Sequence, residues 1–149
     1  MGGMVMENVK RGFAKKTAGM ILLAAFPVSA AGTTVKVSVK GKLDYEKAYQ
    51  ALTYTNQIRA KAGASALKMD NDLMNVAMQR AAEISLLFSH NRPDGTDCFS
   101  ASSKMYAENI AAGQASASAV TTAWKNSSGH YANMVNKSYR SIGIGCFNC

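Results

Sequence analysis

The sequence predicts one α+β domain, with helices packed on a small antiparallel sheet. Residues 44–62 and 71–87 carry apolar or small side chains at the three- and four-residue steps of a helix. Residues 105–110 and 139–146 have strand-like patterns instead. The resulting order of helix, helix, strand, helix and strand is typical of helices covering a small sheet, and a chain of 149 residues suits one core.

Residues 1–30 have the pattern of a secretory signal peptide. Basic residues at positions 10, 11, 15 and 16 precede an uncharged run, residues 17–28, which ends in small side chains. The run is too short to cross about 30 Å of hydrocarbon, and the small residues suit a cleavage site. We therefore predict a secreted protein with no membrane span after cleavage. A retained N-terminal membrane anchor is the alternative.

The basic charge of the chain does not indicate nucleic-acid binding. Four of the 17 cations and one of the nine acids lie in the predicted leader, so 13 cations and eight acids remain, a net charge of +5. Part of the positive charge thus belongs to the export signal. Residues 31–43 alternate β-branched and polar side chains with lysines, and we predict a basic leader or linker there, with an edge strand as the alternative.

The three cysteines, Cys98, Cys146 and Cys149, all lie in the predicted exported part, where disulfides can form. Because the number is odd, two arrangements stay open. Either Cys98 pairs with one of the other two and leaves a thiol, or the C-terminal pair acts separately, for example with a partner chain. The final C-x-x-C spacing does not open a helix, so it is poor evidence for redox chemistry.

The predicted domain begins with two helices. Asp44 can cap the first helix, residues 44–62, and Gly63 can follow its last turn. Asp70 can cap the second, residues 71–87. This second helix delivers one of the two histidines, His90, just beyond its end.

The second half of the domain is less regular. A turn is required at residues 93–95, where proline precedes Asp-Gly. A strand follows at 105–110, and a third helix starts from Ser116 or Ser118 and ends near Ser127. One more helical turn fits residues 130–135. The last strand, residues 139–146, contains two glycines that suggest close approach by another backbone.

Four short motifs in this order resemble the CAP superfamily, or SCP domain, in its bacterial secreted branch. This superfamily includes cysteine-rich secretory, antigen 5 and pathogenesis-related proteins. The resemblance covers residues 44–146. The motifs are Phe88-Ser89-His90-x-Arg92-Pro93-Asp94-Gly95, Glu108-Asn109-Ile110, Ala123-Trp124 with Ser128-Gly129-His130-x-x-Asn133, and Ile142-Gly143-Ile144-Gly145.

The resemblance implies a three-layer α-β-α sandwich, with a CAP domain over residues 44–149 and a surface cleft. The family places two histidines and two acids in that cleft, and some members bind a divalent metal there. His90, Glu108 and His130 match three of the four positions, and Ser127 stands where animal members have the second acid. The family pattern also continues into one more strand than this sequence contains. The chain is therefore a candidate fragment or incomplete gene product, with a sheet edge left unpaired.

The site residues allow metal-binding and structural interpretations. Neutral imidazoles of His90 and His130 with the Glu108 carboxylate would form a His₂Glu set for a divalent metal, most readily zinc, with an open position. Alternatively, both histidines bond backbone groups and hold their loops together. Glu108 is also a candidate catalytic general base or an acceptor for backbone N–H groups. A nucleophilic Ser127 or Ser128 lacks a visible orienting group and oxyanion hole.

Two functional hypotheses follow. The first is a secreted CAP-domain protein, at most a weak enzyme, whose His/Glu cleft binds a divalent metal, a small ligand or a partner protein at the cell surface. The second is a metal-dependent extracellular hydrolase with Glu108 as general base. Lipid binding occurs in the family, but no residues here indicate it.

Four further polar residues are predicted to have structural roles. Arg59 and Arg80 lie on apolar helix faces and should pair with carboxylates or carbonyls, with Asp94 as one candidate partner. Asn109 and Asn133 should satisfy buried backbone groups.

Overall fold

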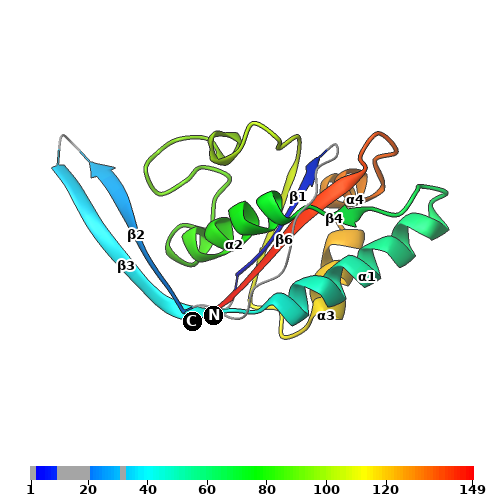
Figure 1. The fold of residues 1–149 in the computed structure, drawn as a ribbon, viewed down its shortest axis with the longest axis horizontal. Coiled ribbons are helices and arrows are strands. Elements are labelled where there is room, and N and C mark those ends of the chain that lie inside the picture. Colours follow the sequence, from blue (N-terminus) through cyan, green and yellow to red (C-terminus); the bar gives the residue numbers. More distant parts are fainter. Residues whose placement is uncertain (1–2, 10–20, 31–32) are drawn as a thin grey trace.

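The computed structural model describes residues 3–9, 21–30 and 33–149. Its helices are α1 (Tyr45–Lys61), α2 (Asn71–Leu86), α3 (Ala117–Lys125) and α4 (Ser128–Val135), with a 3-10 turn, η1 (Cys98–Ala101). Its strands are β1 (Gly3–Val9), β2 (Ile21–Ala30), β3 (Thr33–Leu43), β4 (Lys68–Met69), β5 (Glu108–Ala112) and β6 (Ser141–Asn148), and Figure 1 shows their arrangement. The predicted α+β class is confirmed.

The two long helices begin and end close to the predicted residues. The Asp44 side chain caps α1, and Asp70 caps α2 by accepting bonds from two backbone N–H groups of its first turn. Gly63 follows α1 with a φ of +65°, a conformation that glycine adopts without steric cost. The caps satisfy N–H groups that the helices themselves cannot bond.

The later elements agree with the prediction in kind, with shifted starts. Strand β5 begins at Glu108 rather than at residue 105, because the Met105 N–H bonds the Ser102 carbonyl in a turn. Strand β6 begins at Ser141 rather than at residue 139, because the Tyr139 N–H bonds back to residue 136. Alternation of side chains cannot reveal these turns.

The sheet is mixed, and β6 is its central strand. The order is β2-β3-β6-β1-β5, with antiparallel neighbours throughout, and β4 pairs with β6 in parallel. Strand β3 pairs with β2 along its whole length but with β6 only at Lys42 and Leu43. The rest of the β2–β3 hairpin diverges from β6, as Figure 1 shows, and α2 contacts both of its strands. The segment predicted as a leader or edge strand is thus strand β3.

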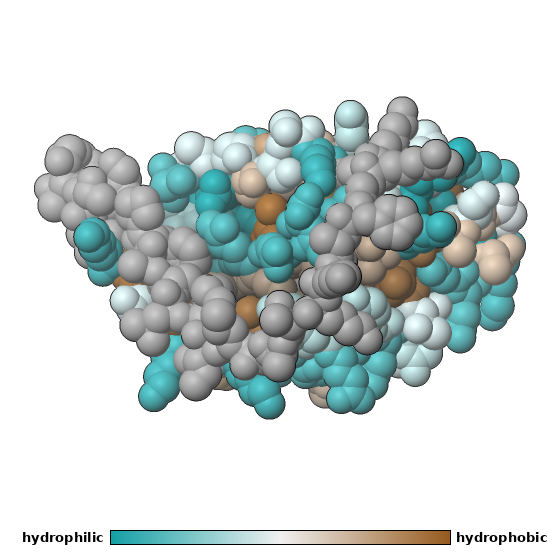
Figure 2. Space-filling model, viewed as in Figure 1, coloured by the Kyte–Doolittle hydropathy of each residue, from teal (hydrophilic) through white to brown (hydrophobic). Residues whose placement is uncertain are grey.

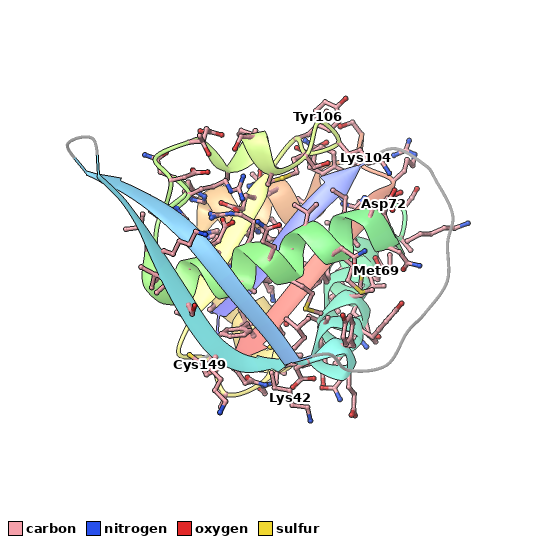
Figure 3. All side chains as sticks on the ribbon, turned by 60° about the vertical axis from the view of Figure 1, so that its left-hand side comes forward. Lys42, Met69, Asp72, Lys104, Tyr106 and Cys149 are labelled. Carbon is pink, nitrogen blue, oxygen red and sulfur yellow. The ribbon has the colours of Figure 1, made fainter. Side chains whose placement is uncertain are left out.

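Both faces of β6 are covered. Residues 141–147 are all buried. A Cβ on Gly143 or Gly145 would meet the backbone of α2 at 2.3 Å or less, so the glycine face of the strand lies directly against that helix. Ile142 and Ile144 alternate with the glycines and face the other side, where α1 contacts β6. Figure 3 shows α2 crossing the sheet. Helices on both faces agree with the predicted layered sandwich.

Strand β1 lies between β5 and β6 and pairs with both. Its residues face residues 108–112 of β5 and residues 141–147 of β6. In the described residues the sheet order ends at β5, so the expectation of an unpaired edge from a missing strand stays a prediction. The predicted leader includes β1 and β2, whereas its basic positions and residues 17–20 lie outside the described residues.

The main core joins apolar side chains from helices and sheet, including Trp124, Phe147 and Met134. Arg59 is fully buried among them and donates to the carbonyls of residues 65, 134 and 136, which ties α1 to the end of α4. The predicted pairing of Arg59 with carbonyls is confirmed. On the face shown in Figure 2, the described residues are mainly hydrophilic, with hydrophobic residues in small areas.

None of the three cysteines, all within the described residues, forms a disulfide. Cys98 and Cys146 are buried, and burial raises the pKa of their thiols to about 12 and about 11. No helix in the described ranges combines the length and apolar character needed to cross a membrane.

Candidate functional site

His90 lies in the loop that follows α2. Its carbonyl accepts a bond from the Cys98 N–H at 2.9 Å, and the neighbouring Asn91 forms a bridge with Asp97. These contacts close residues 91–97 into a loop that starts and ends beside the histidine. The His90 side chain remains 55% exposed, so its ring is held at the surface while its backbone is fixed.

Glu108, the first residue of β5, lies directly behind His90. Its side chain is only 1% exposed. The Oε2 atom is 2.7 Å from His90 Nδ1, and the Oε1 atom accepts from Arg80 Nε at 2.8 Å. An isolated buried carboxylate is costly, and these two contacts offset that cost. Both oxygens of Glu108 are therefore engaged within the protein.

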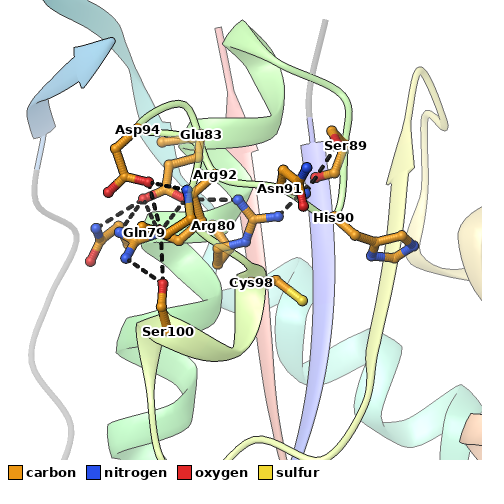
Figure 4. A network of polar contacts seen from close by, with 12 residues as sticks. Gln79, Arg80, Glu83, Ser89, His90, Asn91, Arg92, Asp94, Cys98 and Ser100 are labelled. Carbon is orange, nitrogen blue, oxygen red and sulfur yellow. Dashed lines mark hydrogen bonds and ion pairs between the residues drawn. The ribbon is translucent and has the colours of Figure 1, made fainter. Parts of the chain in front are cut away.

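Arg80 belongs to a buried charge network, shown in Figure 4. It bonds Glu108, Glu83 at 2.7 Å and the Ser89 carbonyl at 2.9 Å, and Arg92 also bonds Glu83 at 2.7 Å. Burial alone would lower the pKa of Arg80, but the bonds to both glutamates raise it. The predicted pairing of Arg80 with carboxylates is confirmed. Its partners are Glu83 and Glu108 and do not include Asp94. The alternating charges hold the His90 loop against α2.

His130 lies in the first turn of α4. Its Nδ1 atom is 2.8 Å from Ser127 Oγ. Burial lowers the pKa of His130, and the positive charge of a protonated His90 lowers it further. The neutral form that binds metals is the favoured one.

Strand β5 connects the two histidines. Asn109 follows Glu108, and its side-chain amide donates to the His130 carbonyl at 3.0 Å. Asn133 in turn donates to the Asn109 side chain at 2.9 Å. The predicted structural role is confirmed for Asn109, which bonds a backbone carbonyl, whereas Asn133 bonds another side chain. Consecutive residues of one strand thus fix the His90 ring and the His130 backbone.

Both imidazoles are oriented through Nδ1. The Glu108 carboxylate can only accept, so Nδ1 of a neutral His90 carries the proton and Nε2 carries the lone pair. Ser127 can accept the Nδ1 proton of His130 in the same way. Neither Nε2 atom has a hydrogen-bond partner among the described residues. An exposed, oriented Nε2 lone pair is the arrangement that metal-binding histidines have.

A second arrangement of possible ligands lies on the inner side of His90. Ligand atoms of His90, Cys98 and Glu108 all lie within 4.8 Å of one another, and His130 is not part of this group. Burial and the nearby Glu108 carboxylate raise the pKa of Cys98 to about 12. A metal there would have to break the bond between His90 and Glu108 and displace a strongly held thiol proton.

Sequence reasoning missed two features of this site. Cys98 follows the Asp-Gly turn within eight residues of His90, and that proximity was the only available signal. The family resemblance marks Ser127 only as the position of a missing acid, whereas in the structure its hydroxyl contacts His130. A three-residue separation at a helix start is compatible with such a contact but does not predict it.

The comparisons with known proteins agree on one family. The model of the cysteine-rich secretory protein family, CAP, matches residues 52–149. An uncharacterized Bacillus subtilis protein, YkwD, is 32% identical over 128 residues, which are 80% of this chain and 49% of that protein. This chain therefore spans about half the length of that relative.

A solved structure is also similar. It is the 1.5 Å crystal structure of an extracellular protein containing a SCP domain from Bacillus anthracis. The match has a TM-score of 0.62 and 26% identity, and it covers 70% of this chain and 40% of the other.

Proposed function

Because the chain belongs to the cysteine-rich secretory protein family, CAP, we propose that it is an extracellular binding protein with a divalent-metal site at His90 and His130. Zinc is the ion that suits two neutral imidazoles best in this setting. Localisation outside the cell is supported by the extracellular description of the Bacillus anthracis protein. The site then binds a small ligand or a partner protein at the cell surface.

The observation that carries the proposal is the matched orientation of the two histidines. Each Nδ1 contacts an oxygen of the protein, Glu108 Oε2 at 2.7 Å and Ser127 Oγ at 2.8 Å. This leaves each Nε2 available as a ligand. These contacts support a metal ion held by the two imidazoles, with its remaining positions open to water or to a bound ligand.

Glu108 acts in this proposal through His90 rather than as a third ligand. Its oxygens are already bonded to His90 and Arg80, and a carboxylate behind a histidine raises the basicity of the ligating nitrogen. The inner group with Cys98 is less suitable, because binding there would sacrifice these bonds.

The hydrolase hypothesis has less support from the geometry. A metal bound at His90 and His130 would supply a Lewis acid. A general base, however, needs a free lone pair within reach of the proton that it removes, and Glu108 is 1% exposed with both oxygens engaged. A non-catalytic binding function is the better account.

Zinc titration followed by thermal unfolding tests the proposal. Wild-type protein should unfold at a higher temperature as zinc is added, because ligands that bind only the folded state stabilise it. His130→Ala should lose most of this shift while its unfolding temperature without zinc changes little. Asn126→Ala, at the exposed end of α3, is a matched control and should keep the full shift. Equal shifts in the wild type and His130→Ala would refute the proposed site.

A further inference from the structure

Ser127 is an N-cap residue that does not cap its helix. It precedes α4 in an extended conformation, yet its side chain makes no bond to the first-turn N–H groups. The N-cap residues of the other α-helices, Asp44, Asp70 and Ser116, all accept such bonds. Serine is a favoured cap residue because its oxygen can accept this bond. At Ser127 the hydroxyl contacts His130 Nδ1 instead.

We propose that Ser127 is a positioning residue for His130, and that its hydroxyl performs the orienting role that Glu108 performs for His90. The proposal rests on the metal site proposed above and deepens it. Its basis is the 2.8 Å contact together with the missing cap bond. A hydroxyl that served only α4 would be expected on the backbone of that helix.

The proposed role specifies which nitrogen of His130 is available as a ligand. When the Ser127 oxygen accepts the proton of Nδ1, the lone pair of the ring lies on Nε2. A free histidine side chain favours the proton on Nε2, so the ring needs a partner at Nδ1 to reverse this preference. The hydroxyl supplies that partner without a charge. The absence of an acid at this position therefore does not remove the orienting group.

Two serine variants separate positioning from helix capping. Ser127→Ala should weaken zinc binding about 10- to 100-fold, the usual cost of losing a group behind a metal-binding histidine, and should hardly change thermal stability. Ser116→Ala removes a cap bond to the Ala119 N–H, so it should lower stability and leave zinc affinity unchanged. Ser127→Thr keeps the hydroxyl and should restore zinc affinity. Unchanged affinity in Ser127→Ala, with binding still dependent on His130, would overturn the proposal.

A measurement without metal distinguishes failure of this inference from failure of the metal site. Nitrogen-15 NMR of the imidazoles, at a pH where His130 is neutral, reports which nitrogen carries the proton. Wild-type His130 should carry it on Nδ1, and Ser127→Ala should move it toward Nε2, whether or not zinc binds. The same proton position in both proteins would show that Ser127 does not position the ring.

Discussion

At the scale of single residues, the site depends on which atom each side chain presents. Glu108 and Ser127 differ in charge but contact the same nitrogen of their respective histidines. The two partners therefore affect the charge of the imidazole differently. A carboxylate stabilises a protonated imidazole, and a hydroxyl does so much less. His130 should thus lose its proton more easily than a histidine paired with an acid.

The titration of His130 provides a test at this scale. Its pKa should lie below the ordinary value of about 6.5, because burial and the charge of His90 both disfavour the protonated ring. In His90→Ala the pKa should rise, since one of the two causes is removed. NMR titration of the His130 ring protons measures both values. A His130 pKa that is unchanged in His90→Ala would show that the rings do not interact.

The same shift has a consequence for stability. A folded-state pKa below the unfolded-state value means that the unfolded chain binds more protons in this range. The contribution of His130 to stability is therefore complete above its unfolded pKa and declines as the pH falls toward the folded value. Denaturant unfolding as a function of pH should show this decline, and it should be smaller in His130→Ala.

The sequence identified three of the residues at this face but not their contacts. His90, Glu108 and His130 stand in motifs whose order is recognisable. The bond between Ser127 and His130 depends on the rotation of one side chain, which no pattern encodes. The pairing of Arg80 with Glu83 and Glu108 combines a three-residue step along α2 with a contact 28 residues away. Only the three-residue step from Arg80 to Glu83 can be recognised in a sequence.

At the scale of elements, the close packing of α2 on β6 is the most demanding contact. A Cβ on Gly145 would lie 2.0 Å from the Ala77 carbonyl oxygen, which is a backbone atom and cannot rotate away. The sequence predicted such an approach from the glycines but could not name the neighbour. Helix boundaries were predicted closely because caps are local signals. Strand boundaries were displaced because turns near residues 105 and 139 end the alternation.

Two alanine substitutions test this packing. Gly145→Ala should lower the free energy of unfolding by about 3 kcal/mol, because overpacking against a backbone forces the helix and strand apart. Gly129→Ala, in α4, has open space at the same position and should stabilise the protein by up to about 1 kcal/mol. Urea unfolding measures both. Similar stability of the two variants would contradict the described contact.

At the scale of the whole molecule, the position of β1 is the feature that sequence reasoning did not anticipate. The first thirty residues have the composition of an export signal, and composition carries no information about pairing with strands 100 or more residues away. In the structure residues 3–9 pair with both β5 and β6. Removal of the predicted leader would therefore separate these two strands and open the sheet.

A cross-link in the full chain tests this placement. Met4 lies opposite Cys146 across the β1–β6 pair, so Met4→Cys should form a disulfide with it under oxidising conditions. The experiment is best done with Cys149→Ser, and peptide mass spectrometry identifies the linked residues. Val5 lies opposite Gly145, so Val5→Cys should form little disulfide with Cys146. Equal linkage from positions 4 and 5 would contradict the pairing register.

The most direct test of the proposed metal site is nitrogen-15 NMR of the two imidazoles during zinc addition. We predict that the Nε2 signals of His90 and His130 shift together as zinc binds. Both Nδ1 atoms should keep their protons and continue to donate them to Glu108 and Ser127. Zinc bound through Nδ1 of His90, with loss of the Cys98 thiol proton, would instead identify the inner group as the metal site. That result, or no change at either ring, would contradict the account.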